Sequence, residues 1–471
     1  MNSTSADIAN NPDVASNIGL IEIWLQAKMA YEELPGTAVA IVHDQDLIYA
    51  RGFGQADVEA GTPVTPDSIF RIASHSKLFT AISIMQLRDE GKLGLDDPIE
   101  QHLPWFNIEN RHPDSRPITV RHLLTHTSGL PREAGSSYWL DFDFPTLELI
   151  KERLPGQQTV FPTETRWKYS NLALALAGEV VAAVSGRSFA DYVQANILDP
   201  LAMTSTSVIF PDDQRDRLVT PYSRRLPGSE REPLPFVDAA AMAAATGLSS
   251  TVADMARFIS WQFRLLERDE TEVLAAKTLR EMQRPHWIQP DWESGWGIGF
   301  GIDHCDDRDL VGHGGGYPGN LTSTRISPKE RVGVVVFTNS ADSTPAEISD
   351  RVFEWLAPSI VRAAAGESAS APDPAWGQYQ GTYRNLWGDS HVLPIEGKLK
   401  MITPTLRDPK PDAMTLEPDG EHAFILDGKG SGPIGEPVVF ELRPDGNATR
   451  VRVGDGWFDR VSYPVPMHPA R

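Results

Sequence analysis

Two residues that could form a nucleophile and its base, Ser74 and Lys77, lie three positions apart at the start of an apolar run. Within that run Leu78, Ile82 and Met85 recur at helical spacing. Residues three apart share one face of a helix, so the Lys77 amine can approach the Ser74 hydroxyl. Burial can lower the pKa of a lysine until it accepts a serine proton. The spacing predicts an activated serine; the alternative is a helix-capping Ser74 beside a solvated Lys77.

A tyrosine and an asparagine form a second candidate group, Tyr169 and Asn171, directly before the alanine-rich helical run 172–181. A phenol can relay a proton when a cation lowers its pKa, and an asparagine amide can donate to a substrate carbonyl. Taken alone, at a junction between a loop and a helix, the tyrosine would be a structural anchor and the asparagine a helix cap. Their position after the Ser-x-x-Lys motif favours a place in the same site.

A glycine-rich segment that contains His313, Gly314, Gly315 and Gly316 is the third candidate. It lies between two strand-like runs. Glycines let a substrate approach the backbone closely, and a free N–H there can complete an oxyanion hole. The alternative is a glycine-rich hairpin with a structural histidine.

In this order Ser-x-x-Lys, Tyr-x-Asn and His-x-Gly resemble the motifs of the serine β-lactamase and penicillin-binding-protein superfamily. The resemblance spans residues 18–365. It looks like the class C branch, with its family VIII-type esterases and D-aminopeptidases, because Tyr-x-Asn stands where class A enzymes have Ser-Asp-Asn. Further segments that carry it are Leu34–Ala40, His122–Pro131, Gly247–Thr251 and Gly295–Gly297.

The resemblance implies that Ser74 is the acylated nucleophile and that Lys77 and Tyr169 share the proton transfers. The backbone N–H groups of Ser74 and Gly316 would form the oxyanion hole. Which of Lys77 and Tyr169 is the general base stays open. Neither a metal nor a cofactor is expected.

The same resemblance implies a substrate-binding set made of Asn171, His313, Gly314 and Gly315. His313 stands where many relatives have a lysine. A histidine is mostly neutral near its usual pKa of about 6.5, whereas a lysine is a fixed cation that attracts the carboxylate of a β-lactam. Strong penicillinase activity is therefore not expected.

These residues predict a serine hydrolase that acts through an acyl-enzyme on carboxylic esters, small amides or peptides. One alternative is an aminopeptidase for D-amino acids or unusual peptides, in which acidic residues such as Glu164 hold the substrate amine. Another is a non-catalytic scaffold or a peptidoglycan-binding protein that keeps the fold.

Composition limits the other classes of function. The 471 residues include 43 basic and 64 acidic side chains, a net charge of −21, which disfavours nucleic acid and anionic membranes as partners. Within the first thirty residues there is one basic side chain, Lys28, and no uninterrupted apolar core, so we expect neither a signal peptide nor a membrane anchor. The single cysteine, Cys305, favours a cytoplasmic location. A homo-oligomer is left open.

The elements that must position the motifs predict an α+β fold. Runs 37–42 and 47–50 form a hairpin after a helix at 18–31, and run 331–337 supplies another strand. Strands at both ends with helical material between them indicate an antiparallel sheet flanked by helices, with a helical subdomain. A last helix would cover 346–365.

A second domain is predicted after a linker of small residues and prolines at 366–374. Residues 1–365 would form the hydrolase domain, and residues 375–471 a small lipocalin-like β-barrel that serves as a lid, specificity or oligomerisation module. Its predicted strands are 382–384, 391–395, 398–402, 423–426, 438–442 and 449–453. In the first domain, the acidic segment 303–309 contains metal-ligand types but is typical of a solvated hairpin tip.

Overall fold

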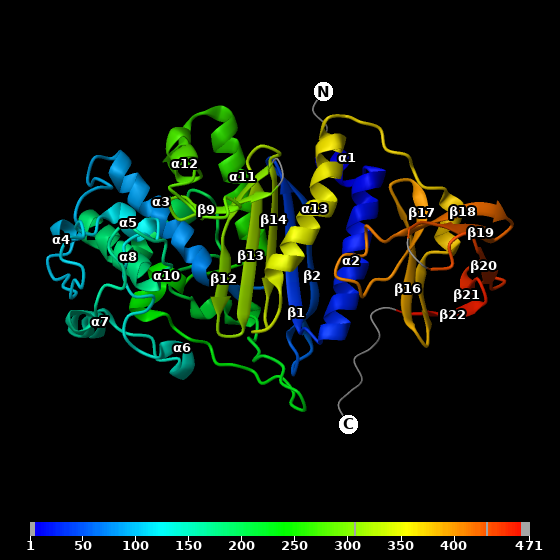
Figure 1. Ribbon diagram of the computed structural model, residues 1–471, viewed down its shortest axis with the longest axis horizontal. Coiled ribbons are helices and arrows are strands. Elements are labelled where there is room, and N and C mark those ends of the chain that lie inside the picture. The colour runs from blue at the N-terminus through cyan, green and yellow to red at the C-terminus, as the bar shows by residue number, and fades with distance from the viewer. Residues whose placement is uncertain (1–4, 306–307, 430–431, 463–471) are drawn as a thin grey trace. The chain divides into compact units, whose positions relative to one another are not determined.

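The computed structural model describes residues 5–305, 308–429 and 432–462. It divides into two compact units, each described here by itself. One contains residues 35–349. The other joins residues 1–34 to residues 350–471 (Figure 1). Residues 1–4 of the predicted hydrolase domain and residues 463–471 of the predicted barrel domain lie outside the described residues. The boundaries of the two predicted domains stay a prediction.

A ten-stranded antiparallel sheet forms the frame of the first unit. Its order is β3-β2-β1-β14-β13-β11-β10-β9-β8, and β12 pairs with β13. This arrangement confirms the predicted antiparallel sheet and its first hairpin. The strands are β1 (Gly36–His43), β2 (Asp46–Asp57), β3 (Thr62–Pro63), β8 (Trp287–Ile288), β9 (Ser294–Trp296), β10 (Gly301–Cys305), β11 (Arg308–Gly312), β12 (Gly314–Tyr317), β13 (Asn320–Ser327) and β14 (Val332–Thr338).

The central strands β1 and β14 are buried along their whole length. That pattern is typical of strands covered on both faces. Helix α11 (Val252–Arg268) packs against both of them. A Cβ on Gly333 would lie 2.6 Å from Ile259 of this helix, so the absence of a side chain there allows the close approach. The sheet is thereby held rigid behind the site.

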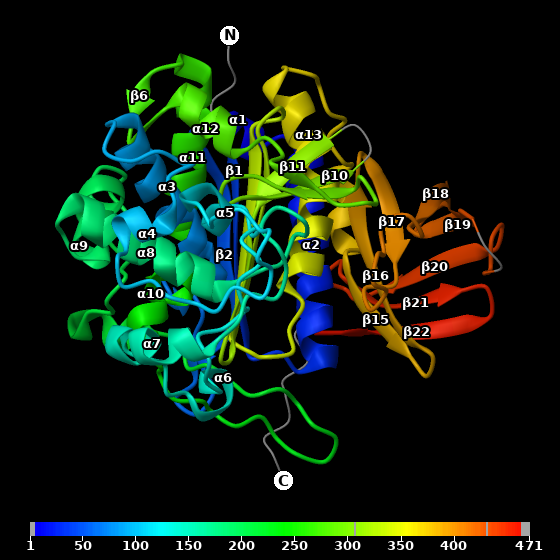
Figure 2. The same ribbon diagram turned by 60° about the vertical axis from the view of Figure 1, so that its left-hand side comes forward.

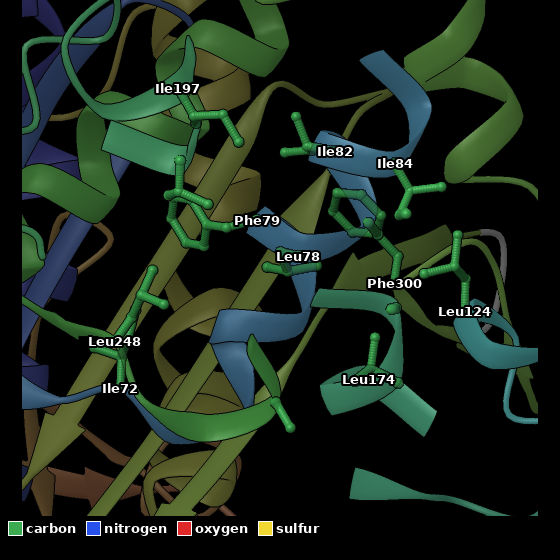
Figure 3. Close-up of a cluster of buried hydrophobic side chains, with 14 of the residues drawn as sticks. Ile72, Leu78, Phe79, Ile82, Ile84, Leu124, Leu174, Ile197, Leu248 and Phe300 are labelled. Atoms are coloured by element: carbon green, nitrogen blue, oxygen red, sulfur yellow. The ribbon is translucent and has the colours of Figure 1, made fainter. Parts of the chain in front are cut away.

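Helix α3 (Ser76–Asp89), which follows the Ser-x-x-Lys serine, is the centre of the helical part of this unit. It packs against α8 (Asn171–Ser185) and α10 (Ala243–Thr246), and Figure 2 shows the helices grouped around it. Figure 3 shows its side chains Leu78, Phe79, Ile82 and Ile84 among Leu124, Leu174, Leu248 and Phe300. Burial on every side fixes this helix, and with it the position of its first turn.

The remaining helices of this unit are short. They are α4 (Ile99–His102), α5 (Val120–Leu124), α6 (Tyr138–Asp141), α7 (Leu147–Arg153), α9 (Phe189–Val193) and α12 (Ala276–Met282). Among the described residues no single helix is long and apolar enough to cross a membrane. One pair of helices, Asn171–Ser185 and Phe189–Leu198, is long and apolar enough only when the two are taken together, and the pair is bent by 77°.

The acidic segment forms a hairpin, because Cys305 in β10 pairs with Arg308 in β11. The two residues between them, 306 and 307, lie outside the described part of the chain. The imidazole of His304 lies 2.7 Å from Asp309.

The second unit combines a barrel with helices from the start of the chain and from the segment that precedes the barrel. These are α1 (Ser5–Ala9), α2 (Pro12–Glu32) and α13 (Pro345–Ala364), of which residues from 350 onward belong to this unit. Trp24 of α2 stands edge-on to Trp355 of α13, with ring centroids 5.2 Å apart. Its indole N–H donates to the Leu406 carbonyl at 3.1 Å. Trp24 thus joins both helices to the barrel segment.

Eight antiparallel strands close the predicted barrel. They are β15 (Gly381–Asn385), β16 (Gly388–Ile395), β17 (Lys398–Ile402), β18 (Met414–Gly420), β19 (Ala423–Asp427), β20 (Pro437–Leu442), β21 (Ala448–Val453) and β22 (Gly456–Val461). The six predicted strands are confirmed. The prediction missed β18, which ends in a Pro-Asp-Gly sequence, and β22, in which no residue is buried. Neither has the apolar alternation on which the prediction depended.

Candidate active site

Ser74 lies in a single 3-10 turn, Ala73–His75, that leads directly into α3. The residue before it, Ala73, has a φ of +52°, a backbone conformation that residues other than glycine rarely adopt. Strand β12 lies against this turn, because a Cβ on Gly315 would be 2.5 Å from the Ile72 carbonyl oxygen and 3.0 Å from Ala73 Cβ. The glycine-rich motif and the serine turn are thus in contact, and only glycine fits there.

Lys77 is completely buried behind Ser74 and directs its amine at three oxygens. Lys77 Nζ lies 3.1 Å from Ser74 Oγ, 2.8 Å from Asn171 Oδ1 and 2.7 Å from the Ala245 carbonyl oxygen. Burial lowers the pKa of Lys77 well below its usual 10.5, against the Glu133 charge that raises it. Burial therefore shifts the protonation equilibrium of this lysine toward the neutral amine.

Tyr169 approaches the same serine from the other side. Its hydroxyl donates to Ser74 Oγ at 2.8 Å, and the Lys77 amine lies 4.7 Å from the centre of its ring. Burial raises the pKa of the Tyr169 phenol above 10, although the Ser74 hydrogen bond and the Arg132 charge lower it. The phenol therefore keeps its proton.

Asn171, the first residue of α8, connects Lys77 to a carboxylate that sequence analysis did not single out. Its Nδ2 donates to Glu133 Oε1 at 2.8 Å. Glu133 also accepts hydrogen bonds from the Tyr138 hydroxyl and from Arg132 Nε. One amide N–H of Asn171 is therefore occupied, which leaves one for the predicted contact with a substrate.

His313 is buried at the wall of the site and stays uncharged. Burial lowers its pKa well below 6.5, and the nearby Lys77 and His75 lower it further. Its Nδ1 faces the Gly314 carbonyl oxygen, so this nitrogen carries the proton and Nε2 presents a lone pair. His313 is thus an uncharged hydrogen-bond acceptor.

The other two histidines near Ser74 have structural partners. His75 turns away from the reacting face, and its ring nitrogens face Thr322 and Thr324 of β13. Burial lowers its pKa to about 4. His126 has a φ of +58°, and its ring centroid lies 4.3 Å from that of Tyr169.

A cleft of about 1200 Å³ opens in front of Ser74. The predicted residues that line it are Ser74, Tyr169, Asn171, His313, Gly314, Gly315 and Gly316. Lys77 lies behind this wall. The oxyanion-hole role of the Ser74 and Gly316 N–H groups stays a prediction.

Sequence reasoning missed several residues of the cleft wall, namely Arg132, Glu133, Trp139, Trp167 and Trp296. Two signals were present, since Arg132 directly follows one of the resembling segments and Trp296 lies within another. Glu164, in contrast, does not line the cleft. Its carboxylate lies 3.2 Å from His122 Nε2 and 3.4 Å from Arg116. The predicted acidic contact with a substrate amine therefore fails at this residue.

A family model described as Beta-lactamase matches residues 22–358. The chain belongs to the β-lactamase family. This β-lactamase-family chain is 26% identical over 356 residues to Beta-lactamase-like protein 2 of Dictyostelium discoideum, in a match that covers 74% of this chain and 64% of that protein. It is 33% identical over 177 residues to Penicillin-binding protein 4* of Bacillus subtilis, in a match that covers 37% of this chain and 38% of that protein. The matches span less than two thirds of either relative.

Solved structures are similar over more of this β-lactamase-family chain. An octameric penicillin-binding protein homologue from Pyrococcus abyssi is 26% identical, with a TM-score of 0.64 over 94% of this chain and 99% of that one. A class C β-lactamase from Rhodobacter sphaeroides is 21% identical, with a TM-score of 0.61 over 73% of this chain and 99% of that one. At this identity the similarity shows the fold alone. The predicted family and its class C-like fold are confirmed.

Proposed function

We propose that this chain is a serine hydrolase that acts through an acyl-enzyme on carboxylic esters or small amides and peptides. The observation that carries the proposal is Ser74 Oγ, at an open cleft, 3.1 Å from Lys77 Nζ and 2.8 Å from the Tyr169 hydroxyl. A serine needs a base for its proton, and the leaving group needs an acid. The two neighbours supply both.

The pKa shifts support one division of the two proton-transfer roles. Lys77 takes the Ser74 proton while Oγ bonds to the carbonyl carbon of the substrate. The tetrahedral intermediate then expels the alcohol or amine, which takes a proton from Tyr169, and the Lys77 ammonium returns a proton to the phenolate. Water attacks the ester on Ser74 in the second half and releases the acid. Because Lys77 acts as the neutral amine, acylation should be lost as pH falls through its lowered pKa.

The first prediction concerns the nucleophile. Incubation with a fluorophosphonate should add one adduct to the wild-type protein, and intact-mass analysis should find none on Ser74→Ala. A screen of esters and of D- and L-aminoacyl amides then names the substrate class. A wild type with neither adduct nor turnover would contradict the proposal and favour the non-catalytic alternative.

The second prediction concerns charge at the cleft wall. A neutral His313 provides no cation for a carboxylate. The methyl ester of a penicillin or cephalosporin should therefore have a kcat/KM about tenfold above that of the free acid, a difference of about 1.4 kcal/mol in activation free energy. The pair differs only in the carboxylate. A preference for the free acid would show that another group binds it.

The aminopeptidase alternative does not find its carboxylate in Glu164, which lies outside the cleft lining, but Glu133, Asp291, Asp303 and Glu347 line the cleft. An amino-acid p-nitroanilide compared with its N-acetyl form tests it directly, since an aminopeptidase should lose turnover when the amine is blocked.

The Pyrococcus abyssi relative is octameric, which supports a homo-oligomer for this chain. Light scattering after size exclusion measures that state. A cytoplasmic location and the role of the barrel stay predictions.

A further inference from the structure

Glu133 lies at the cleft wall and is fixed there by three donors. Its Oε1 accepts from Asn171 Nδ2 at 2.8 Å and from Arg132 Nε at 3.1 Å. Its other oxygen accepts from the hydroxyl of Tyr138, a side chain buried in the core. A carboxylate held by this many partners has one orientation, although part of it faces the cleft.

The orientation of Glu133 decides which way the Asn171 amide points. A carboxylate can only accept, so the amide must turn its NH2 group to Glu133 and its carbonyl oxygen to Lys77. The flipped amide would set two acceptors against each other at Glu133. At Lys77 its NH2 group would compete with the Ser74 hydroxyl for the lone pair of the neutral amine.

The Asn171 carbonyl in turn decides where the Lys77 lone pair points. A neutral lysine has two N–H bonds and one lone pair for the three oxygens around Nζ. Asn171 Oδ1 and the Ala245 carbonyl can only accept, and so they take the two N–H bonds. Ser74 has the one hydroxyl proton in this set, and the lone pair therefore faces it.

We propose that Glu133, held by Tyr138, is a positioning residue that fixes the Asn171 carbonyl and thereby aims the Lys77 lone pair at Ser74. The inference rests on the proposed function, because it gives Glu133 a role only where Lys77 is the base for Ser74. Glu133 acts through Asn171 and needs no contact with the reacting atoms.

The charge of Glu133 gives this role a measurable signature. It raises the pKa of Lys77 against the larger effect of burial, while Arg132 lowers that pKa. In the described part of the chain, the other ionisable groups that face Lys77 are Tyr169, His75, His126 and His313. Burial keeps the phenol protonated and the imidazoles uncharged. Loss of the Glu133 charge should therefore lower the Lys77 pKa further.

The test is Glu133→Gln, which keeps the size and removes the charge. We expect kcat/KM to fall about 100-fold, within the range that general acid–base catalysis contributes, with KM little changed. The acidic limb of the pH profile of kcat/KM should move to lower pH. Glu164→Gln is the matched control, since this carboxylate lies outside the cleft lining, and it should keep the wild-type rate and profile.

A second variant, Tyr138→Phe, keeps the carboxylate charge but removes one of its donors. Its rate should fall about tenfold, from the loss of one hydrogen bond to a charged group, while the acidic limb stays in place. If circular dichroism finds Glu133→Gln unfolded, this variant decides, and a wild-type rate overturns the proposal.

Two results for a folded Glu133→Gln overturn the proposal: a wild-type rate, or a loss of activity with an unmoved acidic limb. The fluorophosphonate separates this failure from failure of the proposed function. An unlabelled wild type contradicts the hydrolase itself. A labelled wild type, with Glu133→Gln labelled at the same rate across the pH range, contradicts only the role of Glu133.

Discussion

Ser74→Ala and Lys77→Met should each lose nearly all turnover, and the double variant should lose no more than either. The two side chains act on one proton, since Lys77 Nζ lies 3.1 Å from Ser74 Oγ. A serine without its base is a weak nucleophile, and a base without its serine has nothing to activate. By analogy with other serine hydrolases, each loss should be about 10⁴- to 10⁶-fold in kcat. Steady-state kinetics on the best substrate of the ester and amide screen measures it.

Lys168→Met is the control for this comparison. Lys168 precedes Tyr169 in the chain but does not line the cleft, so its replacement should leave kcat/KM near the wild-type value. Losses from Ser74→Ala and Lys77→Met that multiply in the double variant would show that the two residues act in separate steps. A nearly normal rate for Lys77→Met would assign the base to another group.

Trp24→Ala should destabilise the barrel-containing unit by about 4 kcal/mol, the usual cost of truncating a large buried aromatic side chain. Trp24 is 1% exposed, contacts Trp355 edge-on, and donates to the Leu406 carbonyl. Its removal leaves a cavity where α2, α13 and the barrel segment meet, and it leaves that carbonyl without its donor. Urea unfolding followed by circular dichroism measures the change in the free energy of unfolding.

Trp387→Ala is the matched control, because Trp387 belongs to the same unit and is 90% exposed. Its replacement should change the free energy of unfolding by less than about 0.5 kcal/mol. Equal effects of the two substitutions would contradict a structural role for Trp24.

Local patterns predicted the parts of the site that a single segment carries. Ser74 and Lys77 share one helical turn, and the glycines around His313 form one strand, so their spacing was sufficient. Glu133 was not predictable in this way. It lies in a loop, and its role follows from contacts with Asn171 and Tyr138 that only the folded chain creates.

The same limit applies to the fold. Strands with a regular apolar pattern, such as β14 and β20, were predicted from it, whereas β22 has no buried residue and gave no such signal. Glu164 shows the opposite error, since its nearness to Tyr169 in the chain did not place it at the cleft. Its backbone has a φ of +62° and its carboxylate turns to His122.

The unit that holds the barrel has a consequence for synthesis of the chain on the ribosome. Trp24 and its acceptor Leu406 are 382 residues apart, so α2 emerges long before its partners exist. At usual elongation rates the interval is about 20 to 80 seconds. During that time the apolar face of α2 is a target for chaperones or for premature association. This unit can be completed only after translation of the barrel, whereas every residue of the hydrolase cleft has emerged earlier.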